Sequence, residues 1–468
     1  MSDKITLRRA LGYRDLTLFY IVSGLSLRWV ASAAAAGPGT LAVWVIALVG
    51  FFIPLAASVL ELSSRYPQEG GLYVWTREAF GDFFGFISAW TYWMSNLPFF
   101  PAVLYFGAGS VLFAYGSHLR SLASSSTYYT GFAVMCLVLI TVLNILDVNA
   151  GKWLNNIGSV GSIVPLGVLF ALAAISGWRF GSATHFSSAS MVPHLSIQTA
   201  IFYSTIFFAF GGCEAGSFMG EEIKDPRRTI PRALLSGGMV LALGYIAGTV
   251  AMLIALPSEA VGGPDGFLLG LQALCSRLGV AWLIAPLAVL VGLSAVSGAA
   301  AFLSSTSRLP FVAGIDRYLP PVFGHVHPRF RTPWVAIGAY GLAGVMVTLL
   351  GQAGTTVRGA YNVLVSMSII AYFLPYLLLF ASTIRLQGRP AGPEVFRIPG
   401  GRRASLALAA IGFSSTAVTI VLSVIPSGEE THKALAAAKV LGGTAVLIGM
   451  GVAVFYSAKR KQQHAHSA

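Results

Sequence analysis

Two acidic residues, Glu61 and Glu214, stand well inside or near the ends of long apolar runs of this sequence, and Arg28 is a cation placed deep in such a run. If these runs cross a membrane, each charge costs at least about 2.5–3.5 kcal/mol at a helix centre, so each should face a cavity or a partner. Arg28 could bind an anionic group of a ligand, pair with Glu214 as an ion-pair gate, or anchor its helix near the outer interface. Glu214 could also be a packed carboxyl that accepts hydrogen bonds from freed backbone N–H groups.

The composition indicates that the apolar runs do cross a membrane. Of the 468 residues, 56% are hydrophobic and 10% are charged, whereas a typical soluble domain has about 25% charged residues. A membrane helix needs about 20 apolar residues, and the ten-residue alternation of membrane strands is not seen. The sequence therefore predicts an all-α integral membrane protein with twelve transmembrane helices, at residues 16–36, 40–62, 83–115, 127–147, 155–176, 197–220, 232–257, 281–308, 333–351, 358–385, 404–425 and 434–457.

The basic residues predict the orientation, because Lys and Arg collect on the cytoplasmic side of membrane proteins. Of the 30 Lys and Arg, 23 fall on the side that carries both predicted tails, and Arg28 and Lys439 lie within spans. We therefore expect a multi-pass protein of the cell (inner) membrane with cytoplasmic tails at 1–15 and 458–468. Topology also accounts for most of the net charge of +13. No nucleic-acid partner is expected, since the basic residues do not gather on one aromatic-laced face.

Two of the predicted spans carry glycine in mid-helix beside polar or charged residues. They are the first, at 23–28 (SGLSLR), and the sixth, at 208–214 (FAFGGCE). Because they are five spans apart, the two helices cross in opposite directions, as an inverted repeat requires. Glycine-interrupted helices in corresponding positions point to a transporter's binding site, and close helix packing through small residues is the alternative. Unwound backbone offers N–H groups for a carboxylate and carbonyls for an ammonium, the two groups of an amino acid.

The sequence offers no residue set for catalysis, metal binding or a cofactor. All eight His residues lie in gaps or at the C-terminus, so a Ser/His/Asp set cannot be assembled at membrane depth. Cys136, Cys213 and Cys275 have no metal-ligand spacing. Residues 1–14 lack the pattern of a removable signal peptide. We therefore predict neither an enzyme nor a cofactor.

Several motifs together resemble the amino acid, polyamine and organocation (APC) superfamily of permeases. After the second span, 61–67 (ELSSRYP) and 70–73 (GGLY) are similar to an acidic, proline and double-glycine-tyrosine segment of that family. The sixth span and its exit, 208–214 and 221–231 (EEIKDPRRTIP), resemble the family pattern most closely. Weaker similarity follows at 307–333 and at 396–401 (FRIPGG).

The resemblance implies a five-plus-five inverted repeat of the LeuT type, with helices 1–5 in 16–176, helices 6–10 in 197–385 and two added helices in 404–457. It also implies a substrate site between the broken first and sixth helices, and alternating access. The substrate-binding residues expected at this site are Ser23, Gly24, Leu25, Ser26, Phe208, Ala209, Phe210 and Gly211. The resemblance implies Phe208 and Phe302 as gating aromatics and Glu214 as the coupling acid. Arg28, as one side of an ion-pair gate, and Trp93, as a further aromatic of an apolar lid, are added as gating residues from their types and places in the spans.

The function that the resemblance implies is secondary active transport of amino acids, coupled to protons or to substrate exchange. Arg28 favours neutral or acidic substrates, because a fixed cation repels cationic ones. Transport of cationic amino acids or polyamines and sodium-coupled symport are alternatives, and an amino acid sensor that does not transport is a remote one. Hydroxyls at Ser294 and Ser297 keep a sodium site open.

The sequence also departs from the family in two places. The first helix keeps only Gly24 of the family's Gly-Ser/Ala-Gly segment, and the fifth span has no Lys, which some proton-coupled members carry there. Residues 116–126 contain no cysteine, so we expect no disulfide-linked heavy chain. A homodimer is compatible with the sequence.

Overall fold

The computed structural model describes residues 7–193, 196–261, 265–350, 357–390, 392–425 and 433–467. Within these ranges the regular secondary structure is helical, and the β-pairing is limited to an isolated parallel bridge between Leu11 and Ile223. The predicted all-α class is confirmed.

The α-helices are joined by short turns, 3₁₀ segments and loops. Their bounds are α1 Tyr13–Gly24, α2 Leu27–Ala35, α3 Thr40–Ala47, α4 Ile53–Arg65, α5 Leu72–Phe80, α6 Asp82–Ser95, α7 Phe99–Tyr115, α8 Ser126–Leu146, α9 Val148–Phe180, α10 Ile197–Ala209, α11 Pro226–Ala255, α12 Gly266–Arg277, α13 Ile284–Thr306, α14 Arg308–Ile315, α15 Trp334–Leu350, α16 Val357–Leu386, α17 Gly401–Val424 and α18 Lys433–Ser467.

Helices long and apolar enough to cross a membrane account for most of the predicted spans. The described ranges contain nine such segments, and two shorter apolar helices, Trp334–Leu350 and Ala371–Leu386. The nine are Tyr13–Ala35, Thr40–Arg65, Asp82–Tyr115, Ser126–Leu146, Gly151–Phe180, Pro226–Ala255, Ala281–Ile315, Gly401–Val424 and Leu441–His464. The chain is thus a multi-pass helical membrane protein, as predicted. The predicted span at 197–220 is interrupted, because α10 ends at Ala209, and the short helices α5 and α12 were not foreseen.

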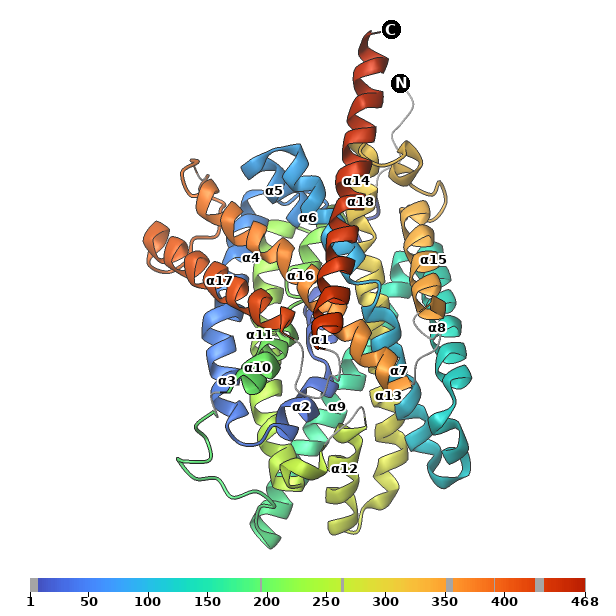
Figure 1. The fold of residues 1–468 in the computed structure, drawn as a ribbon, viewed down its shortest axis with the longest axis vertical. Helices are drawn as coiled ribbons and strands as arrows, with labels where there is room; N and C mark the ends of the chain where they lie inside the picture. The colour runs from blue at the N-terminus through green and yellow to red at the C-terminus, as the bar shows by residue number, and fades with distance from the viewer. Residues whose placement is uncertain are drawn as a thin grey trace.

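The first span lies in the middle of the bundle, and the last two lie at its edge. In Tyr13–Ala35, 72% of the most apolar stretch is buried, against 22% in Gly401–Val424 and 11% in Leu441–His464. In Figure 1, α17 and α18 lie on the outside, and α18 projects beyond the bundle at the end where α5 and α14 lie. The elements that can enclose a site are therefore those packed around α1 and α2.

Helices α9 and α13 pack almost backbone to backbone beside α1. A Cβ atom at Gly158 would lie 2.0 Å from Ser297 Cβ, and one at Gly161 would lie 2.6 Å from the carbonyl oxygen of Leu290. Small residues permit this approach between membrane helices, where close van der Waals contact supplies the association energy.

The buried acid Glu61 ties three helices together. Its carboxylate, on a residue only 6% exposed, pairs with Arg65 at 3.2 Å and accepts hydrogen bonds from Gln387 Nε2 at 2.6 Å and Ser405 Oγ at 2.7 Å. Arg65 in turn donates to the carbonyl oxygen of Leu386 at 3.0 Å. This network joins α4 to α16 and α17, so Glu61 has a structural role.

We expect Glu61→Ala to destabilise the protein by about 3–5 kcal/mol, because it leaves the buried Arg65 cation without its partner. Glu78→Ala is the matched control, because its partner Arg389 is half exposed and surface pairs contribute about 0–1 kcal/mol. Thermal unfolding in detergent compares the two variants. Equal losses of melting temperature would contradict the structural role of the Glu61 network.

Candidate functional site

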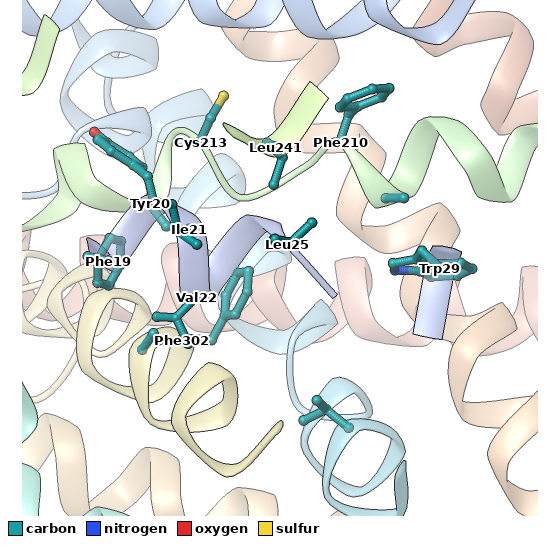
Figure 2. Packing of buried hydrophobic residues seen from close by; sticks show 14 of the residues in the cluster. Phe19, Tyr20, Ile21, Val22, Leu25, Trp29, Phe210, Cys213, Leu241 and Phe302 are labelled. Atoms are coloured by element: carbon teal, nitrogen blue, oxygen red, sulfur yellow. The ribbon is translucent and has the colours of Figure 1, made fainter. Parts of the chain in front are cut away.

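The first predicted helix break is present in the structure. Leu25 and Ser26, between α1 and α2, have extended backbone angles, with φ −88° and ψ 95° and with φ −102° and ψ 116°, respectively. Gly24 has no room for a side chain, because a Cβ atom there would lie 2.8 Å from Leu241 Cδ1 on α11. In Figure 2 the helix that carries Val22 gives way to a thin coil before the helix of Trp29 begins.

The second break follows α10 and touches the first. Residues 210–214 form turns between Ala209 and the 3₁₀ helix Ala215–Glu222, which Figure 2 shows as a coil between Phe210 and Cys213. Gly212 has φ +107°, a conformation that glycine adopts without strain. A Cβ atom at Gly212 would lie 3.3 Å from the carbonyl oxygen of Ser23 and 3.3 Å from Phe302 Cζ. The two interrupted helices therefore meet where their backbones are unwound.

A tyrosine on α11, which the sequence analysis missed, joins the two breaks. The hydroxyl of Tyr245 lies 2.5 Å from the carbonyl oxygen of Gly24 and 3.1 Å from that of Ala209, and it accepts a hydrogen bond from the Ser26 N–H at 3.1 Å. Since a phenol has one hydrogen to donate, its donation is shared between the two carbonyls. Tyr245 thus already engages backbone groups from both predicted substrate-binding segments.

Glu214 lies just beyond the second break and is fully buried. Its Oε1 accepts from the hydroxyls of Tyr92 at 2.5 Å and Tyr372 at 3.2 Å, and its Oε2 accepts from the Gly212 N–H at 3.2 Å. The hydroxyl of Tyr376 also lies 3.4 Å from the Gly212 nitrogen. None of the ion pairs found in the described residues includes Glu214. A carboxyl that accepts hydrogen bonds but is paired with no cation can take up a proton without breaking an ion pair.

The predicted aromatic residues divide between the two faces of the α10 break. Phe208 lies 5.9 Å from Trp29 and 4.9 Å from Tyr372, ring centre to ring centre. Phe210 points elsewhere and packs on Trp44, Phe52 and Tyr245. Phe208 is therefore the aromatic residue that faces α2, the second half of the first span, and α16.

The other two predicted gating aromatics differ in their placement. Phe302 on α13 lies next to Gly212 and packs against Phe99 with ring centres 4.9 Å apart. Trp93 packs on Trp90 and Tyr340. Within the described residues, no ring contact joins Trp93 to Phe208 or Phe302. The structure thus brings Phe302 to the breaks and leaves Trp93 against α15.

Arg28 is buried but does not pair with Glu214. Its guanidinium lies over the rings of Trp29, 5.0 Å away, and Phe99, 5.4 Å away, while Glu214 is held by tyrosines. Ser23 Oγ donates to the carbonyl oxygen of Phe19 in its own helix at 2.8 Å. Of the predicted residues, the structure therefore gathers Ser23, Gly24, Leu25, Ser26, Arg28, Phe208, Ala209, Gly211, Phe302 and Glu214 around the two breaks.

A second charged cluster lies at the end of the molecule near α5 and α14. This Arg308 cluster consists of Glu69, Glu222 and Arg308, each less than 5% exposed. Arg308 donates to both carboxylate oxygens of Glu222, at 2.7 Å and 2.9 Å. Glu69 lies 3.9 Å from Arg308 and accepts from the Glu221 N–H at 2.9 Å. Burial raises the pKa of the Glu69 carboxyl well above its usual value, and the neighbouring Glu222 carboxylate raises it further.

This cluster predicts a pH-dependent stability. Because the pKa of Glu69 is raised in the folded protein, the unfolded chain loses this proton first, and the free energy of unfolding falls as pH rises above about 4.3. Glu69→Gln removes this titration, so the variant should melt at a higher temperature than wild type at pH 8, and the difference should shrink towards acid pH. Glu221→Gln, at the exposed neighbouring position, is the control. Parallel melting curves for wild type and Glu69→Gln across this pH range would contradict the prediction.

The spans and the two touching breaks define a multi-pass helical membrane protein built around a pair of interrupted helices. Comparison with known proteins is more specific: the amino acid permease family matches residues 11–448, and the chain belongs to this family. The predicted membership in the amino acid, polyamine and organocation superfamily is confirmed. Because this is a family of permeases, the chain is a membrane transporter and not an enzyme.

Three relatives illustrate the range of the family. An uncharacterized transporter of Legionella pneumophila is 26% identical over 427 residues, which cover 90% of this chain and 91% of the relative. A probable agmatine/putrescine antiporter of Lactococcus lactis is 22% identical and covers 89% of both chains. A serine/threonine exchanger of Bacillus subtilis is 23% identical and covers 94% of both. The substrates in these names are amino acids or amines.

Proposed function

We propose that this protein is a secondary active transporter that moves amino acids across the cell membrane by alternating access, neutral or acidic ones in preference to cationic ones. The observation that carries the proposal is the contact of the two helix breaks at Ser23 and Gly212, beside the buried carboxyl of Glu214. Interrupted helices that meet in the bundle are where transporters bind small polar substrates. The named substrates of the relatives all contain an amino group, which matches the carbonyls at the breaks.

The proposed architecture has twelve spans, with a five-plus-five inverted repeat in 16–176 and 197–385 and two further helices in 404–457. It is supported by the positions of the breaks, one in the first span and one in the sixth. The proposed orientation puts both tails in the cytoplasm, because 23 of the 30 basic residues fall on that side. The cluster of Glu69, Glu222 and Arg308 then lies at the cytoplasmic end.

The proposed site has the substrate amine at the carbonyls of the α10 break, Phe208 and Phe302 as gating aromatics, and Glu214 as the coupling acid. Proton coupling is favoured because Glu214 has hydrogen-bond donors and no cation. Sodium remains the alternative. Ser297 Oγ is buried without a hydrogen-bond partner among the residues that the structure describes, although Ser294 Oγ donates to the carbonyl oxygen of Val291 in its own helix.

Counterflow in liposomes tests this function. Purified protein is reconstituted in vesicles loaded with unlabelled L-serine, L-glutamate or putrescine, and entry of the same labelled compound is measured with and without sodium. We expect counterflow of at least one amino acid, independent of sodium. Counterflow of putrescine alone would favour the polyamine alternative, and binding without counterflow of any compound would indicate a sensor.

A further inference from the structure

Arg28 is a buried cation with no anion beside it among the described residues. The residue is 3% exposed, and its Nε and Nη1 atoms are buried without a hydrogen-bond partner. In the described part of the chain, no carboxylate lies within 4.0 Å of its guanidinium. Buried arginines are almost always paired, because an uncompensated charge in an apolar interior is costly. The side chain is therefore placed to receive an acceptor that the described residues do not supply to Nε and Nη1.

Aromatic rings hold the guanidinium next to the helix breaks. The faces of Trp29 and Phe99 lie 5.0 Å and 5.4 Å from it, and such cation–π contacts offset part of its lost hydration. Trp29 packs on Phe208, and Phe99 packs on Phe302, the two aromatics that border the breaks. Because rings accept no strong hydrogen bonds, they fix the position of the guanidinium without satisfying its donors.

The backbone N–H groups of the two extended residues of the break, Leu25 and Ser26, are by contrast already engaged. The Leu25 N–H donates to the carbonyl oxygen of Ile21 at 2.8 Å, and the Ser26 N–H donates to the hydroxyl of Tyr245 at 3.1 Å. A carboxylate that approached these two amides would have to displace helix α1's own hydrogen bond or the Tyr245 hydroxyl. The guanidinium of Arg28, two residues further on, carries side-chain donors, Nε and Nη1, for which the described residues supply no acceptor.

We infer that Arg28 is the receptor for the carboxylate of the transported substrate, and that Tyr245 occupies the backbone N–H of the break that would otherwise take this role. The inference rests on the proposed transport function and narrows its substrate class to molecules that carry both an amino group and a carboxylate. A guanidinium fork binds a carboxylate through paired, charge-assisted hydrogen bonds. Amines without a carboxylate, such as putrescine, would leave Arg28 unpaired and add a second positive charge beside it.

The test compares amino acids with their methyl esters, in which the carboxylate is replaced by an uncharged ester, and with an amine that has no carboxylate. The probes are L-serine, L-glutamate, their methyl esters and putrescine, with binding measured by thermal shift on the full-length protein and uptake measured in liposomes. Arg28→Met should weaken binding of the transported amino acid about 10- to 150-fold, the factor expected from hydrogen bonds to a charged group. Binding of the corresponding methyl ester should be the same in wild type and Arg28→Met.

Two further variants separate binding from folding. Without ligand, Arg28→Met should keep or raise the melting temperature, because the guanidinium has no carboxylate partner in the described part of the chain to lose. Arg65→Met is the matched control: this arginine is also buried but is paired with Glu61, so its loss should lower the melting temperature and leave amino acid affinity unchanged. Tyr245→Phe frees the Ser26 N–H. A gain in amino acid affinity in that variant would identify the backbone as the receptor and overturn the assignment to Arg28.

The outcomes distinguish this inference from the function on which it rests. Wild-type protein that moves L-serine or L-glutamate, with unchanged affinity in Arg28→Met, would overturn the role of Arg28 and leave the transporter standing. Uptake of putrescine with no binding of either amino acid would do the same. Wild-type protein that moves none of the probes would overturn the proposed function and this inference with it.

Discussion

Glu214→Gln is expected to abolish the response of transport to a pH gradient while substrate binding persists. The single carbonyl oxygen of glutamine can still accept from Tyr92 or from the Gly212 N–H, which donate to different oxygens of the carboxyl, Oε1 and Oε2. The amide, however, neither gains nor loses a proton. A gradient of one pH unit is worth about 1.4 kcal/mol per proton and supports about tenfold accumulation. In the variant, accumulation driven by such a gradient should therefore fall from about tenfold to none.

The measurement is uptake of labelled amino acid into liposomes with an imposed inside-alkaline gradient, alongside counterflow at equal pH. Glu61→Gln is the matched control, because Glu61 is a second buried acid within a span but is paired with Arg65. It should retain the pH response. An unchanged pH profile in Glu214→Gln would assign Glu214 to packing around the break. Loss of both the pH response and counterflow would show that the side chain is needed for more than coupling.

The features of the fold that the sequence predicted are those that have a strong local signal. A run of about 20 apolar residues has few structural alternatives in a membrane protein, because backbone groups in lipid must be satisfied within the helix. A glycine beside polar residues in such a run marks the place where this rule is relaxed. For this reason the breaks at 23–28 and 208–214 could be located without a structure.

The side chains that complete the site have no such signal. Tyr245 reaches the carbonyl oxygen of Gly24 across 221 positions of sequence, and nothing near Tyr245 in the chain shows which backbone its hydroxyl meets. Tyr92 and Trp93 are neighbours in sequence, but successive helix residues point about 100° apart. Tyr92 therefore bonds to Glu214, while Trp93, the residue that sequence reasoning selected, packs on Tyr340.

Opposite charge alone was also not enough to predict which buried side chains pair with each other in this protein. Arg28 and Glu214 are opposite charges in the two interrupted spans, which made an ion pair a reasonable hypothesis. In the structure, hydroxyl and amide donors satisfy Glu214, and aromatic faces hold Arg28. Neutral donors can thus stabilise a buried carboxyl and leave the cation available for a ligand.

Arg308→Met should be the most destabilising of the single substitutions considered. Arg308 is 2% exposed and holds both oxygens of Glu222, with Glu69 3.9 Å away. Its removal leaves two buried carboxylates facing each other without a cation, a loss of about 3–5 kcal/mol for the broken pair alone. The carbonyl oxygen of Glu222 also accepts from the N–H groups of Ala10 and Leu11. We therefore expect the segment before α1 to detach from this end of the protein.

Two measurements follow the effect of Arg308→Met. The melting temperature should fall well below that of Arg329→Met, a control at an exposed arginine. Leu11 is 8% exposed, so the cysteine of Leu11→Cys should react with a thiol reagent faster when Arg308→Met is also present than when Arg308 is retained. The three native cysteines are buried and should contribute little to the reaction. Glu69→Gln together with Glu222→Gln should restore most of the lost stability, because neutral amides replace the unpaired carboxylates. If this triple variant melts no higher than Arg308→Met, the packing of the arginine side chain, and not its charge, stabilises this end of the protein.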